Sequence, residues 1–549
     1  MRRFALLLIF GLFLSGCSQA PREPGVLHLA QQSDASTLDP AKSYDTTSIQ
    51  WVRLLYRGMV NYDSKANIVN ELAEKREISP DGKTYTFWIR KGVRYHDGSP
   101  VRATDFRYAI ERVTDPATAS DGQSFFNTIV GSEAWIADRK ENKKLQHISG
   151  IEVVNDNKIV FHLTRPDATF LNYLALPFAF PVSQDWVKKV GQKVLSNASA
   201  TPEEIEAAGS DALSENPNGC GPYKLEEWVH DGWLNLVKNP NYFQPSVPKN
   251  NRIEVRFGIA STLQIMLFEQ GQLDIIGISD AFPPEFQRLT KQDPWQKGVM
   301  HRPTMDIRYL SLNTELEPFK DVRVRRAFNY AINVNRIVSL QSGRAMKARG
   351  ALPPGMPAYN PKLFQYEYDP KKAKALLTEA GFYKKSLKIT LDYSDGENWY
   401  SKAAESIRAD LQAVGVDVIL KKGRYSEVKT KAGSRKKSQM AMLGWLQDFP
   451  DPSNFLDICF NSNKISNEAS INRAFYSNPK VDALLNAGAI ETDREKRLNL
   501  YRQAEEQIVQ DAPWVFMVHT ERYIVQQSWV KGFEMNAAWA AIYENVTVD

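Results

Sequence analysis

Four short stretches of the chain carry apolar residues in the alternating or clustered pattern of β-strands. They are VLHLAQQ at 26–32, YTFWIRKGVRY at 85–95, KIVFHLT at 158–164 and LNLVKN at 234–239. In the second stretch Tyr85, Phe87 and Ile89 fall on one face, because successive side chains of a strand point to opposite sides. Asp-Gly pairs on either side of it favour tight turns. We therefore predict strands at all four places.

Two further stretches carry apolar residues at helical spacing. In the first, Asp369 can cap the helix, Pro370 suits its first turn and Gly381 closes it. The second, SKAAESIRADLQAV at 401–414, is followed by Gly415 and a valine-rich strand. A helix that passes through a short glycine turn into a strand is typical of α/β domains. The pattern therefore predicts a mixed α/β fold.

The N-terminal segment, MRRFALLLIFGLFLSGC, combines two arginines, an apolar run and small residues before Cys17. This order is typical of a secretory signal peptide, and the apolar run is too short to span a bilayer. LSGC at 14–17 resembles the lipobox of bacterial lipoproteins, whose cysteine is acylated and exposed by cleavage. We therefore expect a signal peptide at 1–16, lipidation of Cys17 and a lipid-anchored linker at 17–25. The alternative is a simple secretory peptide in which Cys17 is incidental.

Length and composition indicate a large globular body behind this segment. A chain of 549 residues exceeds what one hydrophobic core usually serves, so we expect two or three domains. With 43% hydrophobic and 24% charged residues, it has the composition of ordinary folded proteins. The net charge of +5 gives no reason to expect a nucleic-acid partner. No second apolar run approaches the length of a transmembrane helix.

The remaining cysteines, Cys220 and Cys459, leave two alternatives open. In an oxidising compartment they could form one disulfide; otherwise both are buried free thiols. Sequence alone does not give the distance between them.

Common catalytic motifs are missing from the sequence. It contains no Gly-x-Ser-x-Gly, no His-Glu-x-x-His and no phosphate-binding loop. The seven histidines are scattered singly, without the spacing of metal ligands. The sequence therefore gives no positive evidence for an enzyme, and we expect no metal and no cofactor.

A series of blocks along the chain resembles one protein family. The segment SPDGKTYTFWIRKGVRYHDGSPVRATDFRYAIERVTDP is similar to the signature of the peptide/nickel-type (family 5) extracellular solute-binding proteins of ABC importers. Further blocks follow in the order of that family, namely GPYKLEEW, NPNYF, YLSLNT, FKDVRVRRAFNYAINVNRI, YDPKKAKALLTEAGF and GWLQDFPDPSNFLD. The resemblance extends from residue 26 to about 549 and is strongest to the oligopeptide-binding lipoproteins.

This resemblance implies an α/β fold of three domains in two lobes joined by a hinge, a periplasmic-binding-protein-like (Venus-flytrap) fold. Domain I would be discontinuous, domain II inserted into it, and domain III would form the second lobe. The implied bounds are 26–74, 183–302 and 516–549 for domain I, 75–182 for domain II and 303–515 for domain III. An oligopeptide ligand would be enclosed when the lobes close. A monomeric, exported receptor held at a bacterial membrane by its lipid would then deliver it to the permease of the importer.

The resemblance also suggests where the ligand binds. In relatives that bind peptides, an aspartate three residues after Gly-Trp pairs with the α-amino group of the ligand, and Asp448 occupies that position. A protonated amine enclosed without a counter-charge would be costly. Gly444 and Trp445 would pair their backbone with an extended peptide. The alternative is that Asp448 only shapes the turn formed by Pro450, Asp451 and Pro452.

Other positions match the lining of the family's binding site less strongly. Asp34, Ala35 and Ser36 match a ligand-lining stretch on the opposite wall. Phe125 matches a lining aromatic residue of domain II, although core packing is an equal alternative.

One departure concerns the ligand carboxylate. Some relatives carry an arginine two residues before the glycine, and here that residue is Met442. Arg349, or the basic stretch at 429–437, are candidates to replace it. A solvated charge run is the alternative for that stretch, and a ligand whose C-terminus lies in water would also fit.

Three classes of function follow. The first is a peptide-binding transport receptor. The second is the same fold binding another solute, such as a dipeptide, a nickel chelate, haem, glutathione or an oligosaccharide. The third and most remote is a secreted lipoprotein enzyme. Mass spectrometry of ligands that co-purify with the protein would distinguish the first two.

Overall fold

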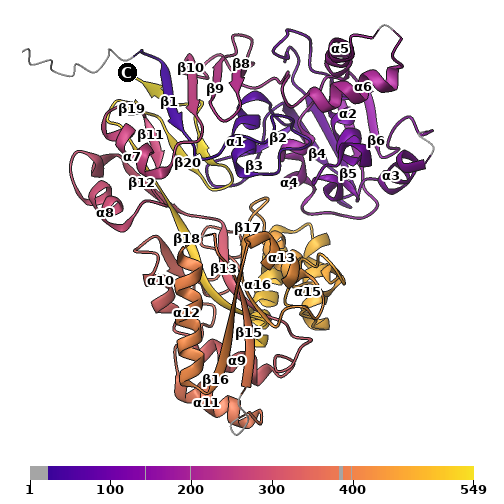
Figure 1. Ribbon diagram of the computed structural model, residues 1–549. Helices are drawn as coiled ribbons and strands as arrows, with labels where there is room; N and C mark the ends of the chain where they lie inside the picture. The colour runs from indigo at the N-terminus through magenta and orange to yellow at the C-terminus, as the bar shows by residue number, and fades with distance from the viewer. Residues whose placement is uncertain (1–22, 142–143, 198, 383–386, 397) are drawn as a thin grey trace, which may run out of the picture.

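The protein has two lobes joined by a pair of chain crossings (Figure 1). The computed structural model describes residues 23–549, except 142–143, 198, 383–386 and 397. The upper lobe contains the start of the described chain and its C-terminus. The lower lobe is built from later segments, coloured from pink to yellow in the figure.

The first part of the upper lobe is a four-stranded sheet in the order β1-β10-β9-β8. Its strands are β1 (Val26–Ala30), β8 (Tyr223–Val229), β9 (Trp233–Lys238) and β10 (Arg252–Arg256). β1 lies parallel to β10 and buries Leu27 and Leu29 in a core that also contains Val546 and Val548. Segments from the start, the middle and the end of the chain therefore share one hydrophobic core.

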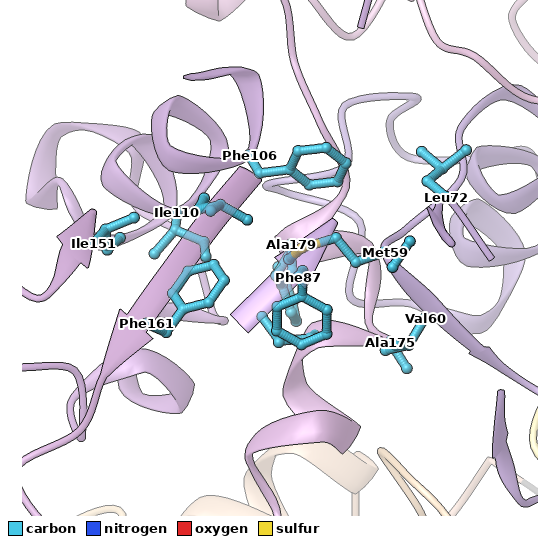
Figure 2. Close-up of a cluster of buried hydrophobic side chains, with 14 of the residues drawn as sticks. Met59, Val60, Leu72, Phe87, Phe106, Ile110, Ile151, Phe161, Ala175 and Ala179 are labelled. Atoms are coloured by element: carbon cyan, nitrogen blue, oxygen red, sulfur yellow. The ribbon is translucent and has the colours of Figure 1, made fainter. Parts of the chain in front are cut away.

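The second part of the upper lobe is an antiparallel sheet in the order β4-β5-β7-β6. Its strands are β4 (Ala73–Ile78), β5 (Thr84–Ile89), β6 (Ile151–Asn155) and β7 (Lys158–His162). Tyr85, Phe87 and Ile89 are all buried, so the predicted apolar face of this strand is confirmed. Phe87 packs with Phe161 in the core drawn in Figure 2.

The remaining elements of the upper lobe surround these two sheets. Its helices are α1 (Thr46–Leu55), α2 (Ala103–Thr114), α3 (Ser132–Glu141), α4 (Phe170–Leu174), α5 (Gln184–Leu195), α6 (Pro202–Ala212), α7 (Ser261–Glu269) and α8 (Pro283–Lys291). Its other strands are β2 (Val60–Tyr62), β3 (Ile68–Asn70), β11 (Ile275–Gly277), β12 (Val299–Pro303), β19 (Val530–Lys531), β20 (Glu534–Asn536), β21 (Ala540–Ile542) and β22 (Thr547–Val548). Short 3-10 helices cover Pro116–Thr118, Gln123–Phe126, Pro177–Ala179 and Trp295–Gly298.

A mixed sheet forms the centre of the lower lobe, in the order β18-β13-β17-β15-β16. Its strands are β13 (Asp306–Leu312), β14 (Ala345–Lys347), β15 (Leu387–Ser394), β16 (Val416–Gly423), β17 (Met440–Leu446) and β18 (Trp514–Gln526). The helices are α9 (Val322–Ala331), α10 (Val334–Ser339), α11 (Pro370–Glu379), α12 (Asn398–Ala413), α13 (Tyr425–Gly433), α14 (Ser453–Phe460), α15 (Pro479–Ile490) and α16 (Arg494–Asp511), with a 3-10 turn at Ser462–Lys464.

Both predicted helices occur in this lobe. Asp369 accepts a hydrogen bond from the backbone N–H of Lys372 and so caps α11. α12 ends before Gly415, whose φ of 91° lies in the left-handed region that glycine adopts without strain, and β16 follows directly. β15 pairs in parallel with both β16 and β17, which agrees with the predicted α/β alternation.

The lobes are connected through two adjacent strand segments. β18 pairs with β13 in the lower lobe and with β12 and β11 in the upper lobe, so it runs through both (Figure 1). The Asp306 carboxylate accepts hydrogen bonds from Thr520 N at 2.9 Å and Thr520 Oγ1 at 2.7 Å. These bonds fix the two crossings together near 304–306 and 520. The second crossing lies later in β18 than the expected boundary at 515/516.

The two cysteines in the described part of the chain are buried free thiols. Cys220 lies in the core of the upper lobe and Cys459 in that of the lower lobe. Burial raises the pKa of the Cys220 thiol to about 12. The structure therefore has two buried free thiols and no disulfide between Cys220 and Cys459. Cys17 lies outside the described residues.

No helix within residues 23–549, leaving aside the short undescribed gaps, has the length and apolar character needed to cross a bilayer.

Candidate functional site

A cleft between the lobes contains two adjoining chambers, of about 650 and 660 Å³. The upper lobe contributes the end of β1 and residues of α1, and the lower lobe contributes β17 and Tyr425. Both chambers are lined by Gln31, Thr47, Gln50, Thr304, Tyr425, Gly444, Trp445, Leu446 and Arg522. Because these residues are shared, the chambers form one continuous cleft that is large enough for a small organic ligand.

The floor of the cleft is an open strand edge. β17 pairs with β13 along its length, but it pairs with β15 only at Met440 and Ala441. The carbonyl of Gly444, which lies in this part of β17, accepts a 3.4 Å hydrogen bond from the hydroxyl of Tyr425. An open edge of this kind can accept an extended peptide as an added strand.

Asp448 lies just after this edge and lines the second chamber. Its Oδ1 accepts a hydrogen bond from the hydroxyl of Tyr44 at 2.7 Å, and its Oδ2 accepts one from Asn454 Nδ2 at 2.9 Å. Burial raises the pKa of Asp448, and these two hydrogen bonds only partly oppose the shift. Among the described residues no cation lies within ion-pair distance of it. The carboxylate is therefore positioned and desolvated without a counter-charge.

Asn454 positions both polar groups at this end of the cleft. Its side chain is fully buried, and its Oδ1 accepts hydrogen bonds from Asp448 N at 2.9 Å and Trp445 Nε1 at 3.3 Å. The sequence analysis missed this residue. Its place at the start of a helix after a proline-rich loop was the one available indication.

The sequence left open that Asp448 only shapes the proline-rich turn at 450–452. In the structure, Asp451 makes most of the side-chain contacts of this turn. The Asp451 carboxylate accepts bonds from the N–H and hydroxyl of Ser453 and forms a bidentate pair with Arg497, both contacts at 2.7 Å. Burial by itself raises the pKa of Asp451, but the charge and hydrogen bonds of Arg497 bring it below its usual value. The Asp448 side chain therefore has one hydrogen bond within this loop, to Asn454, and one outside it, to Tyr44, whereas the bonds to Ser453 and Arg497 belong to Asp451.

Asp34, Ala35 and Ser36 do not line either chamber. Asp34 accepts hydrogen bonds from Trp228 and His230, Ser36 donates to Asp45, and Ala35 is buried in the core. The chain lines the first chamber at 29–33 instead, because it has already turned away by residue 34.

Phe125 and Arg349 also lie outside the lining of both chambers. The ring of Phe125 packs against those of Tyr173, Phe178 and Phe449, which corresponds to the alternative of core packing. Arg349 donates to the carbonyl of Leu363 at 3.3 Å.

Met442 is fully buried beneath the floor of the cleft. In the basic stretch, Lys429 lines the second chamber, whereas Lys431 pairs with Asp392 and Arg435 with Glu315. Two of the five basic residues of this stretch are therefore ion-paired to the protein itself, and one lines the cleft.

Within the described part of the chain, no group of three or more His, Cys, Asp or Glu side chains is arranged to hold a metal ion.

Comparison with known proteins identifies relatives of this architecture. The model for bacterial extracellular solute-binding proteins, family 5 (middle region), matches residues 67–467. The dipeptide-binding protein of Escherichia coli (strain K12) is 28% identical over 513 residues, covering 92% of this chain and 90% of that protein. The oligopeptide-binding protein OppA of Bacillus subtilis (strain 168) is 28% identical over 563 residues, covering 98% of each chain.

Solved structures agree with the two-lobed architecture. The periplasmic binding protein DppA of Helicobacter pylori, in complex with the peptide STSA, superposes with a TM-score of 0.75 at 28% identity, covering 95% of this chain and 98% of that one. The clavulanic acid biosynthesis oligopeptide binding protein 2 gives a TM-score of 0.84 at 22% identity, covering 95% of each chain. The latter similarity concerns the fold alone.

Proposed function

The chain belongs to the bacterial extracellular solute-binding proteins of family 5, and from this premise we propose that it is the oligopeptide receptor of an ABC importer. A peptide would lie in the cleft as a strand added to β17, with its α-ammonium group on Asp448. The lobes would close on it, and the loaded receptor would pass it to the permease. The protein would act as a monomer and would not be an enzyme.

The observation that carries this proposal is the environment of Asp448. A desolvated carboxylate without a cation, at the end of an open strand edge, matches the two constant features of any peptide, which are its ammonium group and its main chain. Backbone pairing ignores side-chain identity, so such a site accepts many sequences. Asp34, Ala35, Ser36, Phe125 and Arg349 are not part of this proposed site.

Contacts between the lobes support closure about the two strand crossings. Tyr44 of the upper lobe reaches Asp448 of the lower lobe, and Ala168 N donates to the carbonyl of Ala489 at 3.1 Å. Both contacts join the lobes through segments other than the strand crossings. The lobes therefore meet around the cleft and can enclose what lies in it.

Ligand-induced closure gives the first prediction. A saturating peptide is expected to stabilise the protein by about 2.7 kcal/mol at a hundred times its Kd, and so to raise the melting temperature. The same peptide is expected to reduce the radius of gyration measured by solution scattering, because the lobes close on it. A diverse peptide mixture that leaves the melting temperature unchanged would contradict the proposed function.

Other solutes form the alternative class. Relatives include Heme-binding protein A of Haemophilus influenzae and glutathione-binding protein GsiB of Escherichia coli (strain K12), so the family name alone does not fix the ligand. Mass spectrometry of compounds released on denaturing the purified protein would separate these cases. Recovery of peptides with free amino groups is the expected result.

Lipid anchoring is the second part of the proposal. Acylation at Cys17 would hold the exported receptor beside its permease, because two or three acyl chains anchor stably. Replacing Cys17 with Ser is expected to move the protein from the membrane to the soluble fraction after cell fractionation. Wild-type protein expressed in parallel is the control, and unchanged membrane partition of the variant would argue against the anchor.

A further inference from the structure

Arg522 is an unpaired cation at the centre of the cleft. It lies in the upper-lobe half of β18, lines both chambers and is half-buried. Among the described residues its guanidinium makes no hydrogen bond and no ion pair. Asp280 and Asp306 are close enough to act on its charge, but both lie beyond ion-pair distance. Burial lowers the pKa of Arg522, which is the response of a cation that lacks a counter-charge.

Two other arginines of the cleft are held by backbone carbonyls. Arg344 donates to the carbonyls of Ser279 and Ala281 at 2.7 and 2.6 Å, and Arg302 to those of Ser64 and Met535 at 3.3 and 3.0 Å. Their donors therefore have protein partners, unlike those of Arg522.

The position of Arg302 adds to the positive charge around Arg522. The two residues are directly opposite each other in the antiparallel pairing of β12 and β18. Like charges at opposed positions destabilise a sheet, and an anion bound beside them would relieve the repulsion. Arg302 lines the second chamber, where Asp448 also lies.

We propose that Arg522 binds a carboxylate group of the ligand, which makes a free carboxylate a determinant of specificity. This inference rests on the proposed function. A guanidinium can hold a carboxylate through two parallel hydrogen bonds, and the pair gains most where both partners are desolvated. Arg522 thereby supplies, from the hinge strand, the cation that Met442 cannot supply from β17.

Asp448 and Arg522 lie on different lobes, so a ligand that binds both would favour closure of the lobes. Asp448 belongs to the lower lobe and Arg522 to the upper-lobe half of β18, yet both line the second chamber. A ligand that carries an ammonium and a carboxylate group would contact one charge from each lobe. Short peptides with both ends free are therefore the expected class. The carboxylate has two possible sources, the C-terminus and an acidic side chain.

The test compares matched ligands by calorimetry. One peptide retained by the wild-type protein is used with a free or an amidated C-terminus, and with Glu or Gln at its acidic position. Wild type is expected to prefer the carboxylate form by a factor of about thirty or more in one of these comparisons. Arg522→Gln is expected to lose most of that preference, and Arg522→Lys to keep part of it.

Two controls keep the result specific. Arg344→Gln removes a cation of the same cleft whose donors already have partners, so the preference should be unchanged. Arg473→Gln removes a third guanidinium of the second chamber, beside Arg302 and Arg522, and its Nε is buried without a hydrogen-bond partner in the described structure. Loss of the preference in Arg473→Gln but not in Arg522→Gln would overturn the assignment.

The remaining outcomes are also decisive. Without ligand, Arg522→Gln should melt at the wild-type temperature or above it, because an uncompensated charge has been removed. A marked fall in its melting temperature would assign Arg522 a structural role and contradict the inference. A wild type that binds peptides with no preference for a carboxylate would refute the inference alone, whereas a wild type that binds no peptide would refute the proposed function with it.

Discussion

Replacing Asp448 with Asn is expected to lower the affinity for unmodified peptides by a factor of about thirty or more. The amide keeps the size of the side chain and a hydrogen-bond acceptor for Tyr44, but it removes the charge that compensates the enclosed ammonium group. N-acetylated peptides have no ammonium, so wild type should discriminate against them and the variant should do so much less. Calorimetry with one peptide in both forms, on both proteins, isolates this coupling.

The pH dependence gives a second measure of the same interaction. Burial raises the pKa of Asp448, so its charge is lost as the pH falls through that raised value. Wild-type affinity for a free-amine peptide should therefore decrease towards acid pH, whereas that of Asp448→Asn should change much less. Tyr44→Phe removes a hydrogen bond that lowers the pKa of Asp448, so the affinity of this variant should begin to fall at a higher pH than that of wild type. An Asn variant that binds the free-amine peptide as tightly as wild type would exclude Asp448 from the site.

The local elements were predictable because they depend on neighbouring residues. The face of β5 and the cap of α11 follow from alternation and from Asp369, both of which are short-range features. β17 was singled out only through its family resemblance. β17 has an open edge because its pairing with β15 ends at Ala441. This pairing joins residues far apart in the sequence, so local patterns do not predict where it ends.

The lining of the cleft was predictable only where one segment of the chain carries it. Asp448, Gly444 and Trp445 lie in one continuous stretch, and the cleft includes all three. Asn454 and Arg522 were missed, because their importance comes from partners, or the lack of partners, across the fold. Asp34, Ala35 and Ser36 were expected in the lining of the cleft, but residues 29–33 lie there instead. The direction in which the chain continues after β1 decides which residues reach the cleft, and this is also a property of the whole fold.

The loop that carries Asp448 depends on a second buried charge. Arg497 in α16 and Asp451 are both buried and form a bidentate pair, while Asp451 also binds Ser453 at the start of α14. Asn454, which positions Asp448, lies one residue further on. The ion pair therefore ties the loop of Asp448 to the body of the lower lobe.

Replacing Arg497 with Gln is expected to reduce the free energy of unfolding at neutral pH by about 3–5 kcal/mol, because it leaves Asp451 buried without its counter-charge. Denaturant titration followed by tryptophan fluorescence measures this loss. Arg494→Gln is the control in the same helix. Its pair with Glu495 is largely exposed, so its removal should change stability by less than about 0.5 kcal/mol.

The pH dependence of the stability lost in Arg497→Gln shows whether the cause is the unpaired Asp451 carboxylate or a packing defect. In wild type the pKa of Asp451 is below its unfolded value of about 3.9, so the stability it contributes is present above that pH and is lost as the pH falls through the folded value. In Arg497→Gln, burial should raise the pKa of the same carboxyl, and the variant gains relative stability as the pH falls through that raised value. The difference in free energy of unfolding between wild type and Arg497→Gln should therefore narrow towards pH 4. The double variant Arg497→Met with Asp451→Asn has no unpaired carboxylate and should recover part of the stability lost at neutral pH. A difference that stays constant with pH would mean that the cavity left by the arginine, and not the unpaired carboxylate, causes the destabilisation.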